Sequence, residues 1–337
     1  MTETHRPDRR GLRVAALIGV LGTVLAAAAV AALVGFGHPS AAGRVPAKPV
    51  PSRKAAEAAE SPQPIAVEPA GKIAFASQAG GGLFHIHVIN ADGSGDTTLT
   101  SGPGEDRDPA WSPDRTRIAF VRHTKADAPD EDADIYVINA DGTGAARFTH
   151  GSGSKGDPAW APDGTRMAFF ATDRSTGRKR IFVQKLDRAR RVDVSDPPQS
   201  CNDREPTWSP DSLRLVFVRK CGEEASALYL MGADGKGLLL LTDFGRTPDW
   251  SPDGGKIVYT GLGTQGPSVY VINVDGTGKT ELTDSGLSGD PEWSPCGAKI
   301  VFAGSDLATV DLFIMNADGS GLSKLTNNPS DDVTASW

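Results

Sequence analysis

The sequence is poor in cysteine, methionine and aromatic residues. It has three Cys and four Met, and Phe, Trp and Tyr together make up 7% of 337 residues. Glycine and proline are abundant, at 39 and 24 residues, nearly one in five, whereas about one in eight is usual. Because both disfavour helix interiors, the composition argues against a helix-dominated fold. The apolar content of 39% is enough for a globular core, which excludes wholesale disorder and collagen.

The sequence also lacks an excess of positive charge. The formal net charge is -7, and its distribution is uneven: +2 on residues 1–13, none on 14–36 and +1 on 37–70, which leaves -10 on residues 71–337. Phosphate binding needs a basic face. An acidic globular part therefore argues against nucleic acid as a partner.

One long stretch without charge lies near the N-terminus. Residues 14–36 form an uncharged segment of 23 residues, which as a helix would span about 34 Å and cross a bilayer. Four arginines precede it, so residues 1–13 are predicted to be a cytoplasmic basic segment and the rest of the chain to be exported. The alternative is a cleaved signal sequence, with a small-residue cleavage site at residues 40–42 and a weak twin-arginine signal at Arg9-Arg10. Both interpretations place the bulk of the chain outside the cytoplasm.

Residues 37–70 differ in composition from the rest of the chain. They contain seven prolines, many Ala and Ser, and almost no large apolar residue that could be buried. Prolines spaced this closely exclude a helix and favour a semi-extended chain. We therefore predict a linker of 34 residues between the apolar segment and a globular domain at 71–337.

The globular part is an internal repeat. Five of the six Trp lie in one phrase of the form Pro-x-Trp-Ser/Ala-Pro-Asp/Cys, and the sixth is the last residue of the chain. The intervals between successive tryptophans are 49, 48, 42, 43 and 44 residues, close to the length of a four-stranded propeller blade. These structural repeat residues are Trp111, Trp160, Trp208, Trp250, Trp293 and Trp337.

Each repeat contains strand signals in the same order. An alternating apolar run comes after the Trp phrase, as at residues 117–121, and a second run comes after the first, as at 134–138. The second run ends in Asn-Ala-Asp-Gly or a close variant, a strong hairpin signal, in every repeat except the one around Leu186-Asp187-Arg188. A short outer strand is expected at the next Leu-Thr or Phe-Thr pair, as at Leu99-Thr100.

The two ends of the repeat region complete one another. Residues 71–75 match the strand after a Trp phrase but have no such phrase before them, and residues 332–337 form a Trp phrase with nothing after it. Pairing these two segments gives six blades of about 44 residues and leaves no free sheet edge. The predicted fold is all-β: a six-bladed β-propeller of four-stranded antiparallel blades, closed by its terminal strands and preceded by one N-terminal helix.

These phrases resemble the WD40-like (PD40) propeller repeat of the TolB family, periplasmic proteins whose C-terminal domain is a six-bladed propeller. The resemblance covers residues 71–337. TolB proteins carry an α/β domain ahead of the propeller that takes part in the Tol-Pal envelope system, and here the linker holds that place, so the resemblance does not extend to that role. Similar propellers precede the hydrolase domain of prolyl-oligopeptidase-type peptidases, which is not expected here because the sequence ends at Trp337.

Two of the cysteines are candidates for a disulfide. Cys201 and Cys221 lie ten residues on either side of Asp211, the centre of a predicted hairpin, so they should face each other across paired strands. An exported protein favours the bridge, and the alternative is two buried thiols. Cys296 replaces the turn Asp of its phrase and is left without a partner.

Four Trp phrases have an acid three residues before the Trp: Asp108, Asp157, Glu205 and Asp290. The Trp phrase forms the innermost strand of a propeller blade, so these carboxylates should gather near one mouth of the central channel. There they could bind a hard cation such as Ca²⁺ or receive a basic side chain from a partner. The other interpretation is that each acid caps a backbone amide between blades and has no other role, and this is favoured because polar groups near a ring of strand ends usually satisfy local donors.

Other polar residues carry weaker signals. His85 and His87 could share a strand face as metal ligands, but His87 occupies the position of Tyr136 and Tyr270, which favours a core aromatic role and no metal. The turn acids Asp114, Asp163, Asp211 and Asp253 are expected to form turns. The acidic stretch at residues 127–134 is expected to be a solvated hairpin loop, with a cation or basic partner as the alternative.

Together these observations predict an exported, monomeric propeller that binds an envelope protein or a peptide at its channel mouth, without a resident cofactor. It would be held at the cytoplasmic membrane by its N-terminal helix, or secreted if the helix is cleaved. The alternative is a carbohydrate-active enzyme, a lyase or glycoside hydrolase that uses the acids at the same mouth. An ectodomain of a sensor would need a second protein, because 13 cytoplasmic residues are too few for a signalling domain.

Overall fold

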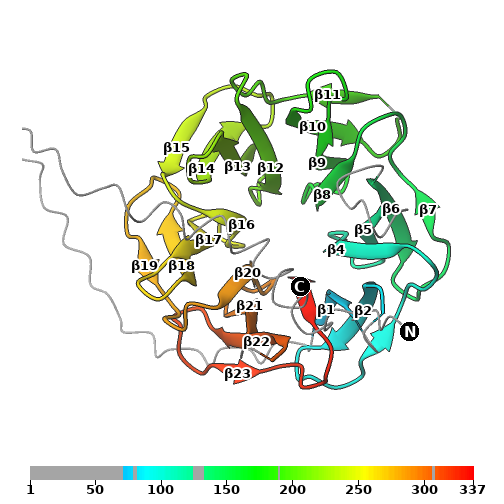
Figure 1. Ribbon diagram of the computed structural model, residues 1–337, viewed down its shortest axis with the longest axis vertical. Helices are drawn as coiled ribbons and strands as arrows, with labels where there is room; N and C mark the ends of the chain where they lie inside the picture. Colours follow the sequence, from blue (N-terminus) through cyan, green and yellow to red (C-terminus); the bar gives the residue numbers. More distant parts are fainter. Residues whose placement is uncertain (1–70, 79–81, 124–132, 189, 306–307) are drawn as a thin grey trace, which may run out of the picture.

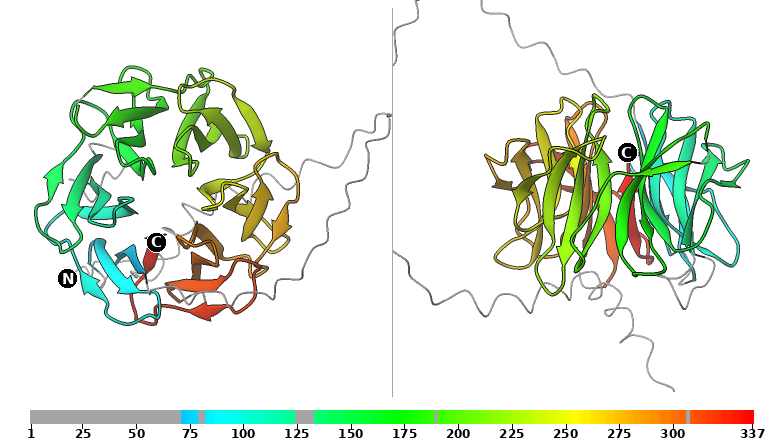
Figure 2. Two further views of the ribbon diagram at one scale, coloured as in Figure 1. Left: turned by 180° about the vertical axis from the view of Figure 1, so that it is seen from behind. Right: turned by 90° about the horizontal axis from the view of Figure 1, so that it is seen from above.

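A computed structural model describes residues 71–78, 82–123, 133–188, 190–305 and 308–337. Within these ranges, twenty-four strands form six four-stranded antiparallel sheets arranged as blades around a central axis (Figures 1 and 2). The described residues contain no helix that is apolar and long enough to span a membrane. The predicted apolar segment 14–36 and the linker 37–70 lie outside the described residues.

The first three blades in chain order are built from β1 to β11 and the C-terminal strand. Blade 1 contains β1 (Lys72–Ser77), β2 (His85–Asn90), β3 (Thr97–Thr98) and the C-terminal strand β24 (Asp332–Ser336). Blade 2 contains β4 (Glu105–Trp111), β5 (Arg117–His123), β6 (Ala133–Asn139) and β7 (Ala146–Arg147). Blade 3 contains β8 (Lys155–Trp160), β9 (Arg166–Thr172), β10 (Lys179–Lys185) and β11 (Arg191–Asp193).

The remaining blades keep the same strand order from the inside outwards. Blade 4 contains β12 (Cys201–Trp208), β13 (Arg214–Cys221), β14 (Ala227–Gly232) and β15 (Leu239–Thr242). Blade 5 contains β16 (Arg246–Trp250), β17 (Lys256–Leu262), β18 (Pro267–Asn273) and β19 (Thr280–Glu281). Blade 6 contains β20 (Ser288–Trp293), β21 (Lys299–Ser305), β22 (Val310–Asn316) and β23 (Ser323–Lys324).

The ring closes through the two ends of the described chain, as the sequence predicts. β24 pairs antiparallel with β1, with Ser77 opposite Asp332, and the Ser77 hydroxyl donates a hydrogen bond to the Asp332 carboxylate at 2.6 Å. Trp337 is buried in a cluster that combines Ile73 and Phe75 of blade 1 with Val301 of blade 6. Both backbone pairing and apolar packing therefore hold blade 1 to blade 6.

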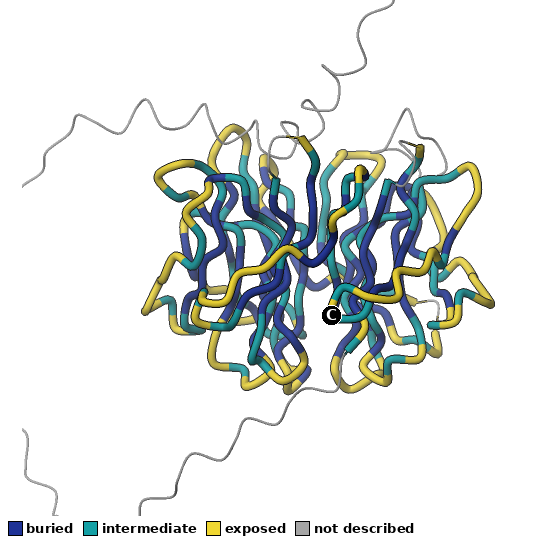
Figure 3. Tube along the Cα trace, turned by 90° about the horizontal axis from the view of Figure 1, so that it is seen from below, coloured by how far each residue is buried: buried dark blue, intermediate teal, exposed yellow. Residues whose placement is uncertain are grey.

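The core lies between blades rather than in one central mass. Each Trp of the phrase packs against the preceding blade, as Trp160 does against Ala119 and Ile135 of blade 2. Strand centres are buried and turns are exposed (Figure 3). A pair of rings stacks or tilts across the second and third strand of every blade, and in blade 1 the pair is Phe75 with His87 at 5.5 Å. His87, 6% exposed, is thus confirmed as a substituted core aromatic.

The outer strands differ from their predicted positions. The Leu-Thr and Phe-Thr pairs mostly come after the outer strand, which in blade 1 is Thr97–Thr98 rather than Leu99-Thr100. The Thr side chain replaces a ladder bond there: the Ile86 amide donates to Thr100 Oγ1 at 2.9 Å, and equivalent bonds reach Thr149, Thr283 and Thr326. This side-chain bond ends the pairing of the third and outer strands, since it occupies the third-strand amide that a backbone carbonyl of the outer strand would otherwise use.

Candidate functional site

The innermost strand of each blade carries a bulge at the position of the candidate acids. The register of β4 against β5 shifts between Arg107 and Ala110, and equivalent shifts occur in the other blades. The residue three before each Trp has a positive φ between 45° and 53°, a left-handed conformation that is uncommon for residues other than glycine. These residues are Asp108, Asp157, Glu205, Thr247, Asp290 and Thr334. The same backbone irregularity thus presents an equivalent side chain six times.

All four predicted acids line one cavity of about 540 Å³ on the axis of the ring, bounded by the Trp phrases of all six blades. The cavity is also lined by two acids that the sequence pattern did not single out, Asp249 and Glu292, and by the guanidinium-bearing Arg115. The site therefore contains more carboxylates than predicted. The signal for the missed pair lies in the residue directly before each Trp, which is Ala in blades 2 and 3 but Thr, Asp, Glu or Ser in the rest.

Several of these carboxylates join neighbouring blades. Asp157 accepts a hydrogen bond from the Glu205 amide at 2.8 Å, and Glu205 in turn accepts one from the Thr247 amide at 2.6 Å. Asp249 and Glu292 accept bonds from the amides of Trp293 and Trp337 at 2.9 and 3.1 Å. The predicted capping of backbone amides between blades therefore holds for Asp157 and Glu205.

Asp108 and Asp290 are held differently. Asp290 donates its amide to Thr260 Oγ1 at 3.0 Å, and no hydrogen bond to the Asp108 carboxylate is present among the described residues. Arg107, beside Asp108, directs its guanidinium over the Phe84 ring at 3.6 Å and pairs with Glu105 at 3.4 Å. The Asp108 carboxylate is thus not committed to joining blades and is the acid most available to a ligand.

The environment of the channel raises the pKa of its acids. Burial, together with the neighbouring charges of Asp290 and Glu205, raises the pKa of Asp108 to about 6. Burial and the charge of Asp108 raise the pKa of Asp157 to about 7, and burial also raises the pKa values of Asp249 and Asp290 to about 6. The carboxylates share a poorly solvated space, so each resists the ionisation of the others. A bound cation would relieve this repulsion.

The end of the channel formed by the Ser-Pro-Asp turns is lined by Trp and Pro. The turn prolines are exposed and border the cavity, while the Trp rings are largely buried between blades. A basic side chain stacks on several of these rings, as Arg117 does on Trp160 at 5.0 Å and Arg166 on Trp208 at 4.7 Å. Hence the six Trp serve the packing of the ring and leave a proline rim around the cavity.

The turn acids have the predicted role. Asp114 accepts bonds from the Ser112 hydroxyl at 2.6 Å and from the Thr116 amide at 3.1 Å, and these bonds lower its pKa to about 2. Asp163, Asp211 and Asp253 make the same side chain to backbone contact. They are turn formers, which confirms the prediction.

Among the described residues, no three His, Cys, Asp or Glu side chains are grouped as a metal centre would require. His87 Nδ1 lies 2.8 Å from Asp96 and its Nε2 3.2 Å from Thr98 Oγ1, so both ring nitrogens have protein partners. Ca²⁺ at the channel acids remains a prediction.

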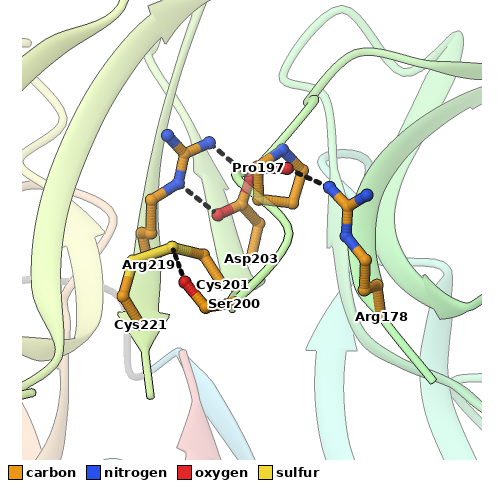
Figure 4. The surroundings of a disulfide bond; sticks show 7 residues. All are labelled: Arg178, Pro197, Ser200, Cys201, Asp203, Arg219 and Cys221. Atoms are coloured by element: carbon orange, nitrogen blue, oxygen red, sulfur yellow. Dashed lines mark hydrogen bonds and ion pairs between the residues drawn. A yellow bond between two sulfur atoms is a disulfide. The ribbon is translucent and has the colours of Figure 1, made fainter. Parts of the chain in front are cut away.

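Cys201 and Cys221 are directly opposite each other in β12 and β13 and form a disulfide (Figure 4). Beside it, Arg219 makes a two-pronged ion pair with the buried Asp203 at 2.7 and 2.8 Å. The bond lies at the end of the hairpin remote from its Ser-Pro-Asp turn. Cys296 is a free, exposed thiol.

The acidic stretch 127–134 is only partly described. Residues 124–132 lie outside the described residues, but Asp134 is the second residue of β6 and is buried rather than part of a solvated loop, which corrects the prediction for this residue. Asp134 contacts Lys155 Nζ at 3.1 Å and the Arg147 guanidinium at 2.5 Å. The two basic partners explain why a carboxylate can be buried there.

A comparison with protein families matches this chain to the TolB beta propeller domain over residues 57–245 and 243–337. Among solved structures, the chain is similar to TolB from Acinetobacter baumannii, with 23% identity and a TM-score of 0.69 over 79% of this chain and 66% of that one. It is also similar to a putative TolB from Agrobacterium tumefaciens, with 20% identity and a TM-score of 0.61 over 76% and 88%.

Two further matches involve enzymes. An oligogalacturonate lyase in complex with manganese has 16% identity and a TM-score of 0.54 over 75% of this chain and 73% of that one. A segment of 68 residues is 38% identical to the uncharacterized peptidase YuxL of Bacillus subtilis. This segment covers 19% of this chain but only 10% of that protein. The structural matches, all under 25% identical, establish the fold.

Proposed function

The chain belongs to the TolB β-propeller domain family, and we propose that it acts as an exported binding module whose channel mouth receives a protein or peptide segment. The proposed contact residues are Asp108, Asp157, Glu205 and Asp290. The group they receive is a basic side chain or a free amino terminus of the partner. Fold alone does not give function, so the proposal rests on the site.

The observation that carries the proposal is the gathering of six carboxylates around one cavity with a single lining guanidinium. Repulsion and burial raise the pKa values there, and an entering cation would lower them and be bound in return. Asp108 supplies the freest carboxylate, while Asp157 and Glu205 fix the geometry through their bonds to the next blade.

The remaining features complete this proposal. We propose residues 71–337 as the binding domain, residues 37–70 as a linker, and residues 14–36 as an anchor in the cytoplasmic membrane, or a signal sequence if it is cleaved. The domain acts outside the cytoplasm as a monomer. An extracytoplasmic site agrees with the disulfide between Cys201 and Cys221, because disulfides persist in oxidising compartments.

The test is crosslinking in intact cells followed by mass spectrometry of the recovered neighbours. Asp108→Asn combined with Asp157→Asn keeps the hydrogen-bonding shape but removes charge, so a defined neighbour should be lost. Asp253→Asn is the matched control, because Asp253 is an exposed turn acid that does not line the cavity. An unchanged set of neighbours in the channel variant would refute this location.

A carbohydrate-active enzyme is the second candidate, favoured by the raised pKa values of Asp108 and Asp157, which suit general acid or base chemistry. Against it, Asp157 and Glu205 are engaged by backbone amides of the next blade, as binding without chemistry predicts. Incubation with oligogalacturonate and other acidic or neutral oligosaccharides distinguishes the two. We expect neither unsaturated products nor new reducing ends, and turnover abolished by Asp108→Asn would favour the enzyme.

A further inference from the structure

An exposed apolar patch lies where blades 3 and 4 meet, on residues in or beside their outer strands and in the turn between β12 and β13, and none of its residues lines the channel cavity. Four of its large side chains are about half exposed or more: Val192 at 57%, Leu213 at 66%, and Leu238 and Leu240 at 49% each. We name these four residues the seam patch. They belong to blades 3 and 4, whose outermost strands, β11 and β15, lie on the rim of the ring (Figure 1).

The strand register places Val192 and Leu240 over one junction. Val192 is opposite Val183, which packs in the core between blades 3 and 4, so Val192 faces blade 4. Leu240 is opposite Tyr229, which packs against the same core from the other side, so Leu240 faces blade 3, and Leu238 directly precedes this strand. Leu213 lies two residues before Leu215 of that core. The patch is thus an exposed continuation of the core between the two blades.

The other blades do not repeat this feature. The outer-strand residue opposite the third-strand aromatic ring, or opposite His87 in blade 1, is polar or charged in five blades and apolar only in blade 4. The five are Thr98, Arg147, Asp193, Glu281 and Lys324. Charged outer strands protect a sheet edge from association, and β15 lacks this protection. Its run of Leu therefore needs an explanation other than the propeller repeat.

The turn beside the patch is also exceptional. Five blades have an Asp-Gly turn between their third and fourth strands, and only blade 3 lacks it. In each of the five, the Asp carboxylate accepts a hydrogen bond from the amide two residues on. In its place, residues 185–191 contain four basic residues and one acid. Lys185, Arg188 and Arg190 are exposed. An apolar patch is thus flanked by the one basic turn of the described repeats, in a domain whose net charge is negative.

We propose that the seam patch and this basic turn form a docking surface for an anionic lipid bilayer. Exposed leucines that enter the interface and basic residues that meet acidic headgroups are the two contributions by which peripheral surfaces bind membranes. The basic turn of blade 3 would attract acidic headgroups, and the apolar side chains beside it would enter the interface, so contact is expected where blades 3 and 4 meet.

The course of the chain supports a lipid surface as the occupant. The Ala91 amide donates to the Gly71 carbonyl, which places the start of the propeller on the face that carries the hairpin turns, the face at which Leu213 and the basic turn also lie. This step rests on the proposed anchor at residues 14–36: the 34 residues of 37–70 could extend over about 110 Å, enough for the seam patch to reach the bilayer that the anchor would occupy.

The test measures the depth of single sites in vesicles, using the full chain with Cys296→Ser so that an introduced thiol can be labelled. A fluorophore is attached at Leu238→Cys, and at Leu322→Cys as the matched control, because Leu322 is 57% exposed but lies in blade 6 beside an Asp-Gly turn. The vesicles contain phosphatidylglycerol or only phosphatidylcholine, with spin-labelled lipid as the quencher.

We expect quenching at 238, not at 322, and only with phosphatidylglycerol. Arg188→Gln and Arg190→Gln should each weaken this contact by about fivefold. Neither change touches the channel, so the neighbours recovered by crosslinking should stay the same. Equal quenching at 238 and 322, or quenching that ignores lipid charge, would overturn the proposal. So would self-quenching of the 238 label without vesicles, which would identify a second copy as the occupant.

Discussion

Single carboxylates in this protein differ in whether folding favours or opposes their charge. Asp157 lies in the channel among other acids, and its pKa is raised from 3.8 to about 7. Asp114 lies in a turn among donors, and its pKa is lowered from 3.8 to about 2. An ionised Asp is therefore destabilising just before the Trp phrase, in the channel, and stabilising in the turn that ends the phrase.

The first prediction rests on the sign of these shifts. The folded state binds the proton of Asp157 more tightly than the unfolded chain does, so stability falls as the pH rises from about 4 to about 7. Asp157→Asn should therefore raise the melting temperature at pH 8 and lose this advantage near pH 4. The measurement is the melting temperature of both proteins across this range.

Asp114→Asn serves as the control for the direction of the predicted change in stability. Its lowered pKa means that the charged form contributes stability above about pH 4, which is lost as the pH falls towards 2. This variant should be less stable than the parent at pH 8, opposite to Asp157→Asn. If both variants shift in the same direction at pH 8, the electrostatic account of the channel is wrong.

The second prediction concerns the disulfide. Cys201 and Cys221 are 20 residues apart, and a bridge that closes a loop of this size stabilises by about 3 kcal/mol. Cys201→Ser combined with Cys221→Ser should lower the unfolding free energy by about that amount in urea. Reductant should destabilise the parent by a similar amount but leave the double variant unaffected. Cys296→Ser should change neither the unfolding free energy nor the effect of the reductant. An unaltered midpoint in the double variant would show that the bridge does not contribute.

At the scale of the element, the Trp phrase defines the innermost strand, and most of its geometry could be predicted from the sequence. Period-two patterning, the Asp-Gly turns and the opposition of Cys201 and Cys221 are all consequences of local rules. The left-handed residue before the phrase proline could not be predicted, because it arises from a bulge that only the paired strand reveals.

The same limit explains the missed residues. Asp249 and Glu292 line the channel from the position directly before the Trp, which holds Ala in blades 2 and 3, so the sequence pattern of the first two phrases gives no carboxylate there. The sequence places Asp134 in a solvated loop because four other acids precede it closely in the chain. Its partners Arg147 and Lys155 come from β7 and β8, so only the tertiary arrangement shows that it is buried.

The third prediction tests the contact between neighbouring blades made by this Asp. Lys155 is 1% exposed and holds Asp134 and the Gly151 carbonyl at 3.1 and 2.6 Å. Asp134→Ala leaves a buried ammonium without its counter-charge and should cost about 3–5 kcal/mol in urea unfolding. Adding Lys155→Met should recover most of this loss. Breaking the more exposed pair of Arg180 and Asp193 with Arg180→Ala should cost about 1 kcal/mol or less.

At the scale of the whole molecule, the ring is regular in its fold and irregular in its chemistry. The Trp intervals and the complementary ends are sufficient to predict six blades and their closure, because every blade must bury the same faces. The channel acids, the apolar β15 and the basic turn of blade 3 vary from blade to blade, since packing does not require them. Function is therefore to be sought where the repeat is broken.

The last prediction tests the closure of the ring. Deleting residues 332–337 removes β24 from β1 and takes Trp337 out of the cluster between blades 1 and 6. Loss of a buried Trp alone costs about 3–5 kcal/mol, and the exposed edge of β1 would in addition be free to pair with other chains. We expect a melting temperature lower by about 10 °C or more, on the order of 2–4 °C per kcal/mol, together with concentration-dependent association in light scattering. Trp337→Phe keeps the strand pairing and should cost far less, without association. A truncated protein that stays monomeric and melts with the parent would show that the ring does not depend on its terminal strand.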